Sequence, residues 1–136
     1  MKAIIVLDAL ENQAKVQRVG DDADIMRTIR GLIDCRTVQL LPLCPDRIPK
    51  GYLALVDEND HEKVQIFNPL ASWLYGCDDH GACITRNAVI VKEIPEDFDF
   101  MTEEEARQIC EDLNDRAEEI FALTMDAVCG KRASSR

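Results

Sequence analysis

The first part of the chain alternates short apolar runs with turn-forming residues. Residues 2–7 form a β-branched apolar run, which is typical of a strand buried on both faces. Residues 14–20 alternate less regularly and predict a second, partly exposed strand that pairs with the first. Asp21 or Asp22 is expected to cap a short helix, because apolar residues then recur at helical spacing, namely Ile25, Met26, Ile29, Leu32 and Ile33.

Three further strands are predicted between residues 35 and 67. Residues 35–41 favour a strand that leaves the sheet at Pro42, since proline cannot donate to a strand ladder. Residues 52–56 and 63–67 are separated by a polar turn and therefore predict the two strands of a hairpin.

A second helix and a buried strand follow. Asn68 is a favourable cap with Pro69 at the first helical position, and Gly76 is a stop signal, so we expect two helical turns. Residues 87–94 form the clearest buried strand of the second half, and residues 95–102 are expected to be a linker.

The last segment carries the strongest helical pattern. Thr102 and Glu105 have the spacing of a capping box, and Gly130 provides a stop. One continuous helix is therefore predicted, with an apolar stripe made of Ala106, Ile109, Cys110, Leu113, Ala117, Ile120, Phe121, Thr124 and Val128.

These elements predict one α+β domain over residues 1–130. Hairpins outnumber strand–helix–strand units, so we expect a mixed, mostly antiparallel sheet with helices packed on one face. The long acidic helix would close the domain, and residues 131–136 are expected to form a basic flexible tail.

The negative charge of the chain is concentrated in one segment. The net charge is −10, and residues 93–119 contain twelve acidic side chains against only Arg107 and Arg116. Direct binding to nucleic acid is disfavoured, because neutralising phosphates requires clustered lysine and arginine.

Two interpretations of this acidic segment remain open. One is a solvated helix face opposite the core, which explains the apolar stripe. The other is a binding surface for a basic protein partner, selected by electrostatic complementarity as in proteins that imitate DNA. The candidate residues are Glu103, Glu104, Asp112, Asp115, Glu118 and Glu119.

A Cys/His grouping raises the question of a metal site. Cys77, His80 and Cys83 are three residues apart and provide three of the four ligands that a structural zinc site usually has. No second ligand pair lies nearby in sequence, so a polar loop with packed cysteines is the alternative. No recognisable catalytic motif occurs, and we expect a protein that is not an enzyme.

Two aromatic residues and an arginine form the last candidate site. Trp73 and Tyr75 offer stacking surfaces, and Arg86 offers a phosphate-binding group. Together they would suit a protein that sequesters a nucleotide or another small molecule, although a lone tryptophan is more often part of the core.

The sequence also predicts a compartment. No apolar run approaches the roughly 18 residues of a membrane span, and the first residues lack the features of an export signal. We therefore expect a cytoplasmic protein without membrane contact, in which the six cysteines stay reduced.

Three stretches resemble a family of small uncharacterised bacterial proteins that are carried by phages, plasmids and conjugative elements. They are the opening MKAIIVLD, the central LVDENDHEKVQIFNPLASWLYG, and HGACITRNAVIVKEIPEDFDFMTEEE, and the resemblance covers roughly residues 1–105. Arg86 and Asn87 stand where a glycine is common in the family. The resemblance implies an accessory protein of a mobile element that interferes with host defence, and it transfers no active-site residues.

The sequence therefore predicts a non-enzymatic binding protein whose acidic helix engages a basic protein surface, such as that of a host defence nuclease inhibited by DNA mimicry. The alternatives are a small-molecule or nucleotide sequestering protein and a zinc-stabilised structural module. The apolar stripe of the last helix is wide enough to serve a dimer interface as well, so a homodimer is a further alternative.

Overall fold

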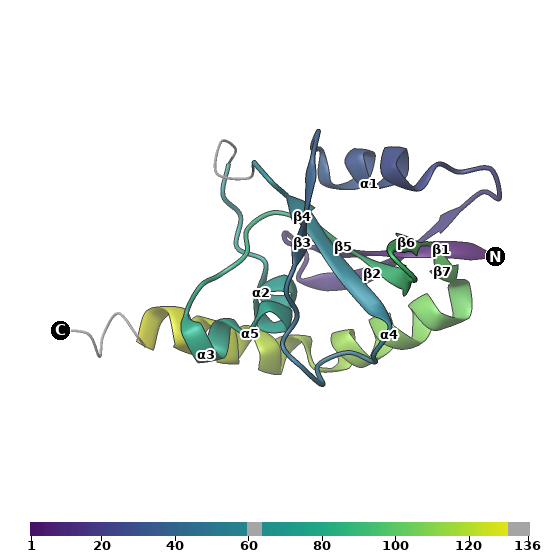
Figure 1. Ribbon diagram of the computed structural model, residues 1–136. Helices are drawn as coiled ribbons and strands as arrows, with labels where there is room; N and C mark the ends of the chain where they lie inside the picture. Colours follow the sequence, from purple (N-terminus) through teal and green to yellow (C-terminus); the bar gives the residue numbers. More distant parts are fainter. Residues whose placement is uncertain (60–63, 131–136) are drawn as a thin grey trace.

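A computed structural model describes residues 1–59 and 64–130 of the protein (Figure 1). The expected tail at 131–136 and the first residue of the expected strand at 63–67 lie outside the described residues. The strands are β1 (Lys2–Asp8), β2 (Gln13–Val19), β3 (Val38–Leu41), β4 (Tyr52–Asp57), β5 (Ala88–Ile94), β6 (Asp97–Asp99) and β7 (Met101–Thr102). The helices are α1 (Ile25–Ile33), α2 (Pro69–Tyr75), α3 (Cys77–His80), α4 (Glu103–Asp115), α5 (Ala117–Met125) and the π-helical turn η2 (Asp126–Gly130).

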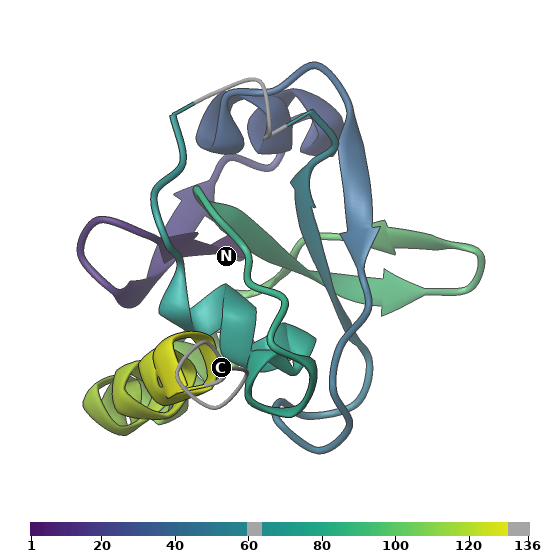
Figure 2. The same cartoon turned by 90° about the vertical axis from the view of Figure 1, so that its left-hand side faces the viewer.

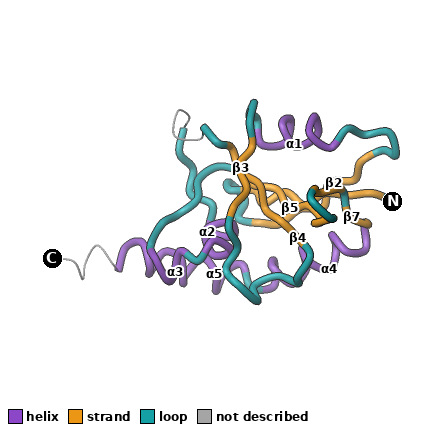
Figure 3. Tube along the Cα trace, viewed as in Figure 1, coloured by secondary structure: helices purple, strands orange, loops and turns teal. Residues whose placement is uncertain are grey.

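The strands, drawn in orange in Figure 3, form one sheet. Its strand order is β2-β1-β5-β4-β3. Every strand pair in the described part of the chain is antiparallel, and β6 and β7 add to β5 and β1 respectively. The predicted α+β class with a mostly antiparallel sheet is therefore confirmed.

Helices cover both faces of this sheet, whereas the sequence analysis placed them on one (Figure 2). Ile5 and Leu7 of β1 face α2, α4 and α5, while Ile4 and Val6 face α1. The physical reason is that β1, β4 and β5 are apolar on both faces, so each face needs a cover to remove it from water.

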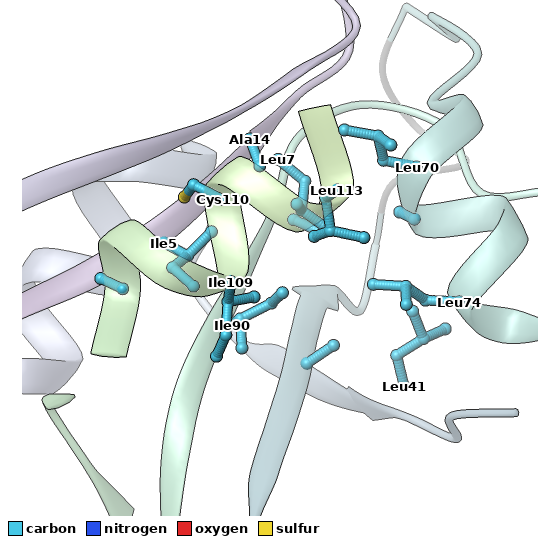
Figure 4. Packing of buried hydrophobic residues seen from close by; sticks show 14 of the residues in the cluster. Ile5, Leu7, Ala14, Leu41, Leu70, Leu74, Ile90, Ile109, Cys110 and Leu113 are labelled. Atoms are coloured by element: carbon cyan, nitrogen blue, oxygen red, sulfur yellow. The ribbon is translucent and has the colours of Figure 1, made fainter. Parts of the chain in front are cut away.

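The larger core lies between the sheet and α4 (Figure 4). Ile109, Cys110 and Leu113 of α4 are buried against Ile5 and Leu7 of β1. Burying side chains of this size contributes roughly 1.5–3 kcal/mol each relative to exposure. This packing fixes one side of α4 against the sheet, so its opposite side must face the solvent.

The first helix begins later than expected. Asp24, rather than Asp21 or Asp22, is the cap, and its carboxylate accepts hydrogen bonds from Met26 N at 3.0 Å and Arg27 N at 3.3 Å. The predicted apolar spacing of this helix is confirmed, because Ile29 is buried and belongs to the core beneath α1.

The predicted hairpin of residues 52–56 with 63–67 is wrong for the part that is described. Residues 64–67 contain no strand, and only Phe67 makes an isolated bridge, to Thr85. The edges of β4 are occupied by β3 and β5, which leaves no place for a further strand.

The expected linker at 95–102 instead contains β6 and β7. β1 and β5 pair over only three residues, from Ile5 to Leu7 of β1. Where the two strands diverge, β6 pairs with β5 through Lys92 and Asp99, and β7 pairs with β1 through Ala3 and Met101. The segment thus fills the opening between two central strands.

The predicted single C-terminal helix is interrupted. Its capping box between Thr102 and Glu105 is confirmed, but Arg116 has φ −108° and ψ 7° and separates α4 from α5. Beyond the break Ile120 is fully buried, as expected. Phe121 was expected to face the core, but it is 45% exposed. No helix in the described ranges is both long and apolar enough to cross a bilayer.

Candidate functional site

The acidic side chains of α4 and α5 lie mainly on the side away from the sheet. Because an α-helix has about 3.6 residues per turn, the buried positions of α4 leave Glu104, Glu111 and Asp115 on the opposite side. Glu103 and Asp112 are nine residues apart, about two and a half turns. They therefore lie on opposite flanks of the helix, and the six predicted residues do not form one compact patch.

Several of these carboxylates are already paired. Glu103 pairs with Arg18 of β2, and Glu104 pairs with Arg107. The Arg116 guanidinium lies 3.3 Å from a Glu119 oxygen. These exposed pairs contribute little stability, with a median of about 0–1 kcal/mol, but each reduces the charge offered to a partner.

Three of the six predicted residues form no ion pair within the described part of the chain. Asp112 accepts a hydrogen bond from Gln108 Nε2 at 3.2 Å. Asp115 and Glu118 are exposed and have no hydrogen-bond or ion-pair partner among the described residues. They are the carboxylates best placed to meet an external cation.

Glu105 is an acidic residue of a different kind, since its carboxylate holds α4 onto the sheet. Its Oε2 atom accepts hydrogen bonds from the Tyr52 hydroxyl at 2.5 Å and from Lys92 Nζ at 2.9 Å. These bonds, with Tyr52 as the main cause, lower the pKa of Glu105 to about 2. Burial, followed by the carboxylate of Glu105, raises the pKa of Tyr52 to about 12.

Asn114 attaches the other end of α4. Its side chain accepts a hydrogen bond from Ala14 N at 2.8 Å and donates one to Ala14 O at 2.9 Å, so it pairs with β2 as a neighbouring strand would. Sequence reasoning identified the capping role of Glu105 but missed both cross-links. Their partners lie far away in sequence and only the fold brings them together.

Two guanidinium groups, those of Arg47 and Arg116, lie over the Trp73 ring. The Cζ atoms lie 4.9 Å and 4.8 Å from the ring centroid, within the range of cation–π attraction. Arg47 also donates to Trp73 O and forms a two-bond pair with Asp78, at 2.6 and 2.9 Å. This pair lowers the pKa of Asp78. Arg47 was missed because nothing in its turn-rich segment signals a contact with Trp73.

The cavity beside Trp73 is small. Its volume is about 80 Å³, and Arg47, Arg116 and Asp112 are among the residues that line it. Sites for drug-sized ligands usually occupy roughly 300–1,000 Å³. Trp73 itself is only 5% exposed. The tryptophan therefore serves as a core residue that docks α5 onto α2.

The proposed ligand set of Trp73, Tyr75 and Arg86 is not brought together in one pocket. Arg86 lines a separate pocket of about 200 Å³, beside Asp8 and Asp34. Tyr75 instead contacts His80 edge to face, with 4.7 Å between the ring centroids.

The Cys/His grouping lies on the one-turn helix α3 and the loop that follows it. Cys77 is buried and Cys83 is exposed. His80 Nε2 lies 2.9 Å from Tyr75 O, and His80 Nδ1 accepts from Ala82 N at 3.1 Å. Coordination of zinc by His80 would require one of these bonds to break.

No metal-binding group of three or more His, Cys, Asp or Glu residues is found in ranges 1–59 and 64–130. Zinc binding stays a prediction. Cys44, Cys83, Cys110 and Cys129 carry free thiols. Cys110 is buried in the larger core, where burial raises the pKa of its thiol to about 12, so it is the packing residue that the helical pattern predicted.

Comparisons with protein-family models, with curated proteins and with solved structures find no match for this chain. The resemblance to mobile-element proteins therefore stays a prediction from the sequence.

Proposed function

We propose that the protein is a binding module whose acidic face engages a basic protein surface without catalysis. The acidic face is the outward side of α4 and α5, formed by Glu104, Glu111, Asp112, Asp115, Glu118 and Glu119. The observation that carries the proposal is the exposed pair Asp115 and Glu118, which have no partner in the described part of the chain.

The acidic face is presented on a rigid support. Leu113 and Ile120 are buried directly behind it, at 3% and 0% exposure. The Glu105 and Asn114 cross-links attach α4 to β4, β5 and β2. A preorganised surface loses little conformational entropy on binding, which favours affinity. A helix that served only solubility would not need such cross-links to hold its acidic side in place.

The charge density of this surface limits the kind of partner. The six carboxylates of the acidic face lie between residues 104 and 119, together with two arginines, and 16 helical residues span about 24 Å. This gives one carboxylate per about 4 Å, whereas duplex DNA has one phosphate per roughly 1.7 Å and a single strand one per roughly 3.4 Å. The charge spacing of the acidic face thus approaches that of a single DNA strand. We therefore favour a partner with a nucleic-acid groove, such as a defence nuclease, which a mobile-element protein would inhibit by occupying that groove.

The test compares two double variants that remove equal charge. Asp115→Asn with Glu118→Gln alters the acidic face, and Asp21→Asn with Asp22→Asn alters exposed residues before α1. Binding is measured by calorimetry against a panel of basic nucleic-acid-binding proteins. We expect the first variant to lose at least tenfold in affinity for a specific partner and the second to lose far less. An attraction that depended on net charge alone would instead weaken both variants equally.

A further inference from the structure

A pocket lies where the end of α1, the turn after β1 and the segment before β5 meet. Its volume is about 200 Å³, and Leu10, Leu32, Ile33 and Ile66 supply apolar lining. Leu10 is 80% exposed although it is a large apolar residue. A cavity of about 150 Å³ is sufficient for a benzene-sized ligand. The pocket therefore has room for a compact ligand, smaller than a nucleotide.

One arginine in this pocket keeps an unused hydrogen-bond donor. The Nε atom of Arg86 is buried and has no hydrogen-bond partner within the described residues. Its Nη2 atom lies 4.0 Å from an Asp34 oxygen, at the outer limit of an ion pair, and the Asp34 side chain is 93% exposed. The guanidinium of Arg86 lines the pocket, so a carboxylate that enters it can pair with this charge.

The backbone holds Arg86 in a strained conformation. Its φ is 67°, in the left-handed region that favours glycine. Arg86 N donates to Ile66 O at 2.6 Å, and Arg86 O accepts from Asn68 Nδ2 at 2.9 Å. Strain of this kind persists where the surroundings over-determine it, and it clusters at ligand sites. The arginine is thus fixed at the pocket by bonds on both sides of its peptide unit.

The charges around Arg86 favour a singly charged anion over a dianion. Asp8 and Asp34 line the same pocket, and Lys15 Nζ lies 3.3 Å from Asp8 and 2.5 Å from Glu11. Two nearby carboxylates repel a phosphate dianion more strongly than a singly charged ligand. A carboxylate matches the planar fork of arginine, and the apolar lining suits a hydrocarbon body.

We propose that this pocket binds a small organic carboxylate, with Arg86 as the group that pairs with it. The body of the ligand is about the size of a benzene ring and packs on Leu32, Ile33 and Ile66. This site lies at the end of α1, and it is independent of the acidic face on α4 and α5.

The test titrates the protein with benzoate, with the neutral and equally shaped benzamide, and with inorganic phosphate, followed by amide chemical shifts of Ala9, Asp34 and Asn87. Benzoate is expected to bind at least tenfold more tightly than benzamide or phosphate. Arg86→Gly is expected to weaken benzoate binding at least tenfold while the fold is kept, because glycine suits the left-handed backbone. Arg36→Gly removes an exposed arginine that does not line the pocket and should leave binding unchanged.

Three results would overturn the proposal. They are tighter binding of phosphate than of benzoate, benzoate binding that Arg86→Gly leaves intact, and no saturable response to any of the three probes. Loss of partner binding by the acidic-face variant has no bearing on this site, so the two proposals fail separately.

Discussion

The guanidinium of Arg116 lies 4.8 Å from the centre of the Trp73 ring, and Arg116 is the residue at which α4 gives way to α5. The contact joins the break in the C-terminal helix to α2. This contact accounts for an arginine in the middle of an acidic segment. The face of the tryptophan ring attracts the guanidinium, and the neighbouring carboxylates attract it as well.

Arg116→Ala is expected to lower the free energy of unfolding by about 1–2 kcal/mol, since a partly buried cation–π contact and the packing of the arginine stem are lost together. Arg107→Ala is the matched control, because Arg107 is an exposed arginine of α4 that pairs with Glu104 and Glu111 and makes no cation–π contact with Trp73 among the described residues. Its expected cost is below about 0.5 kcal/mol. Urea denaturation measures both, and equal losses would contradict the role given to Trp73.

The Glu105 carboxylate makes stability depend on acid. Its pKa is lowered from 4.5 to about 2 in the folded protein. A depressed folded pKa contributes stability that is present above the unfolded value and is lost as the pH falls through the folded one. We expect the wild type to lose stability between pH 4.5 and about 2, and Glu105→Gln, which keeps the capping-box geometry, to lose less over this range. Parallel pH profiles of the two proteins in chemical denaturation would refute this.

The register of α5 can be checked with two neighbouring residues. Ile120 is 0% exposed and Phe121 is 45% exposed. Ile120→Ala is expected to cost about 2–5 kcal/mol because it leaves a cavity, whereas Phe121→Gln should cost less than about 1 kcal/mol. If Phe121→Gln proved the more destabilising in thermal melts, the continuous helix predicted from the sequence would be the better description.

Treatment with EDTA is expected to leave the melting temperature unchanged, because the backbone bonds of His80 hold the α3 turn without a metal. Cys83→Ser is expected to have little effect, since Cys83 is exposed. Stoichiometric zinc in protein purified without chelator, together with a lower melting temperature after its removal, would instead establish the zinc-stabilised module.

The sequence was most informative where a local pattern has a single physical meaning. The capping box at Thr102 and the Asn68–Pro69 helix start were predicted, since each depends on groups within a few residues. The strands β6 and β7 were missed because they are defined by their pairing with β5 and β1, at the point where those two strands diverge. A partner that distant in sequence leaves no local signal.

The candidate sites show the same limit. The sequence identified the acidic segment, but only the structure separates the paired Glu103 and Glu119 from Asp115 and Glu118, which have no partner in ranges 1–59 and 64–130. Arg86 was singled out as a ligand-binding group, yet it was grouped with Trp73, which lies in a different pocket. Residue types were readable from the sequence, whereas their pairing depends on contacts between segments that are far apart.

The central claim is that the acidic face binds a basic protein surface. The most direct measurement is the salt dependence of affinity for a partner from the basic-protein panel, for the wild type and for the two equal-charge double variants. We expect Asp115→Asn with Glu118→Gln to bind at least tenfold more weakly and to depend less on salt, while Asp21→Asn with Asp22→Asn stays close to the wild type. Equal losses in both variants, or none in either, would contradict the claim and leave the acidic side of α4 and α5 as a solvated surface.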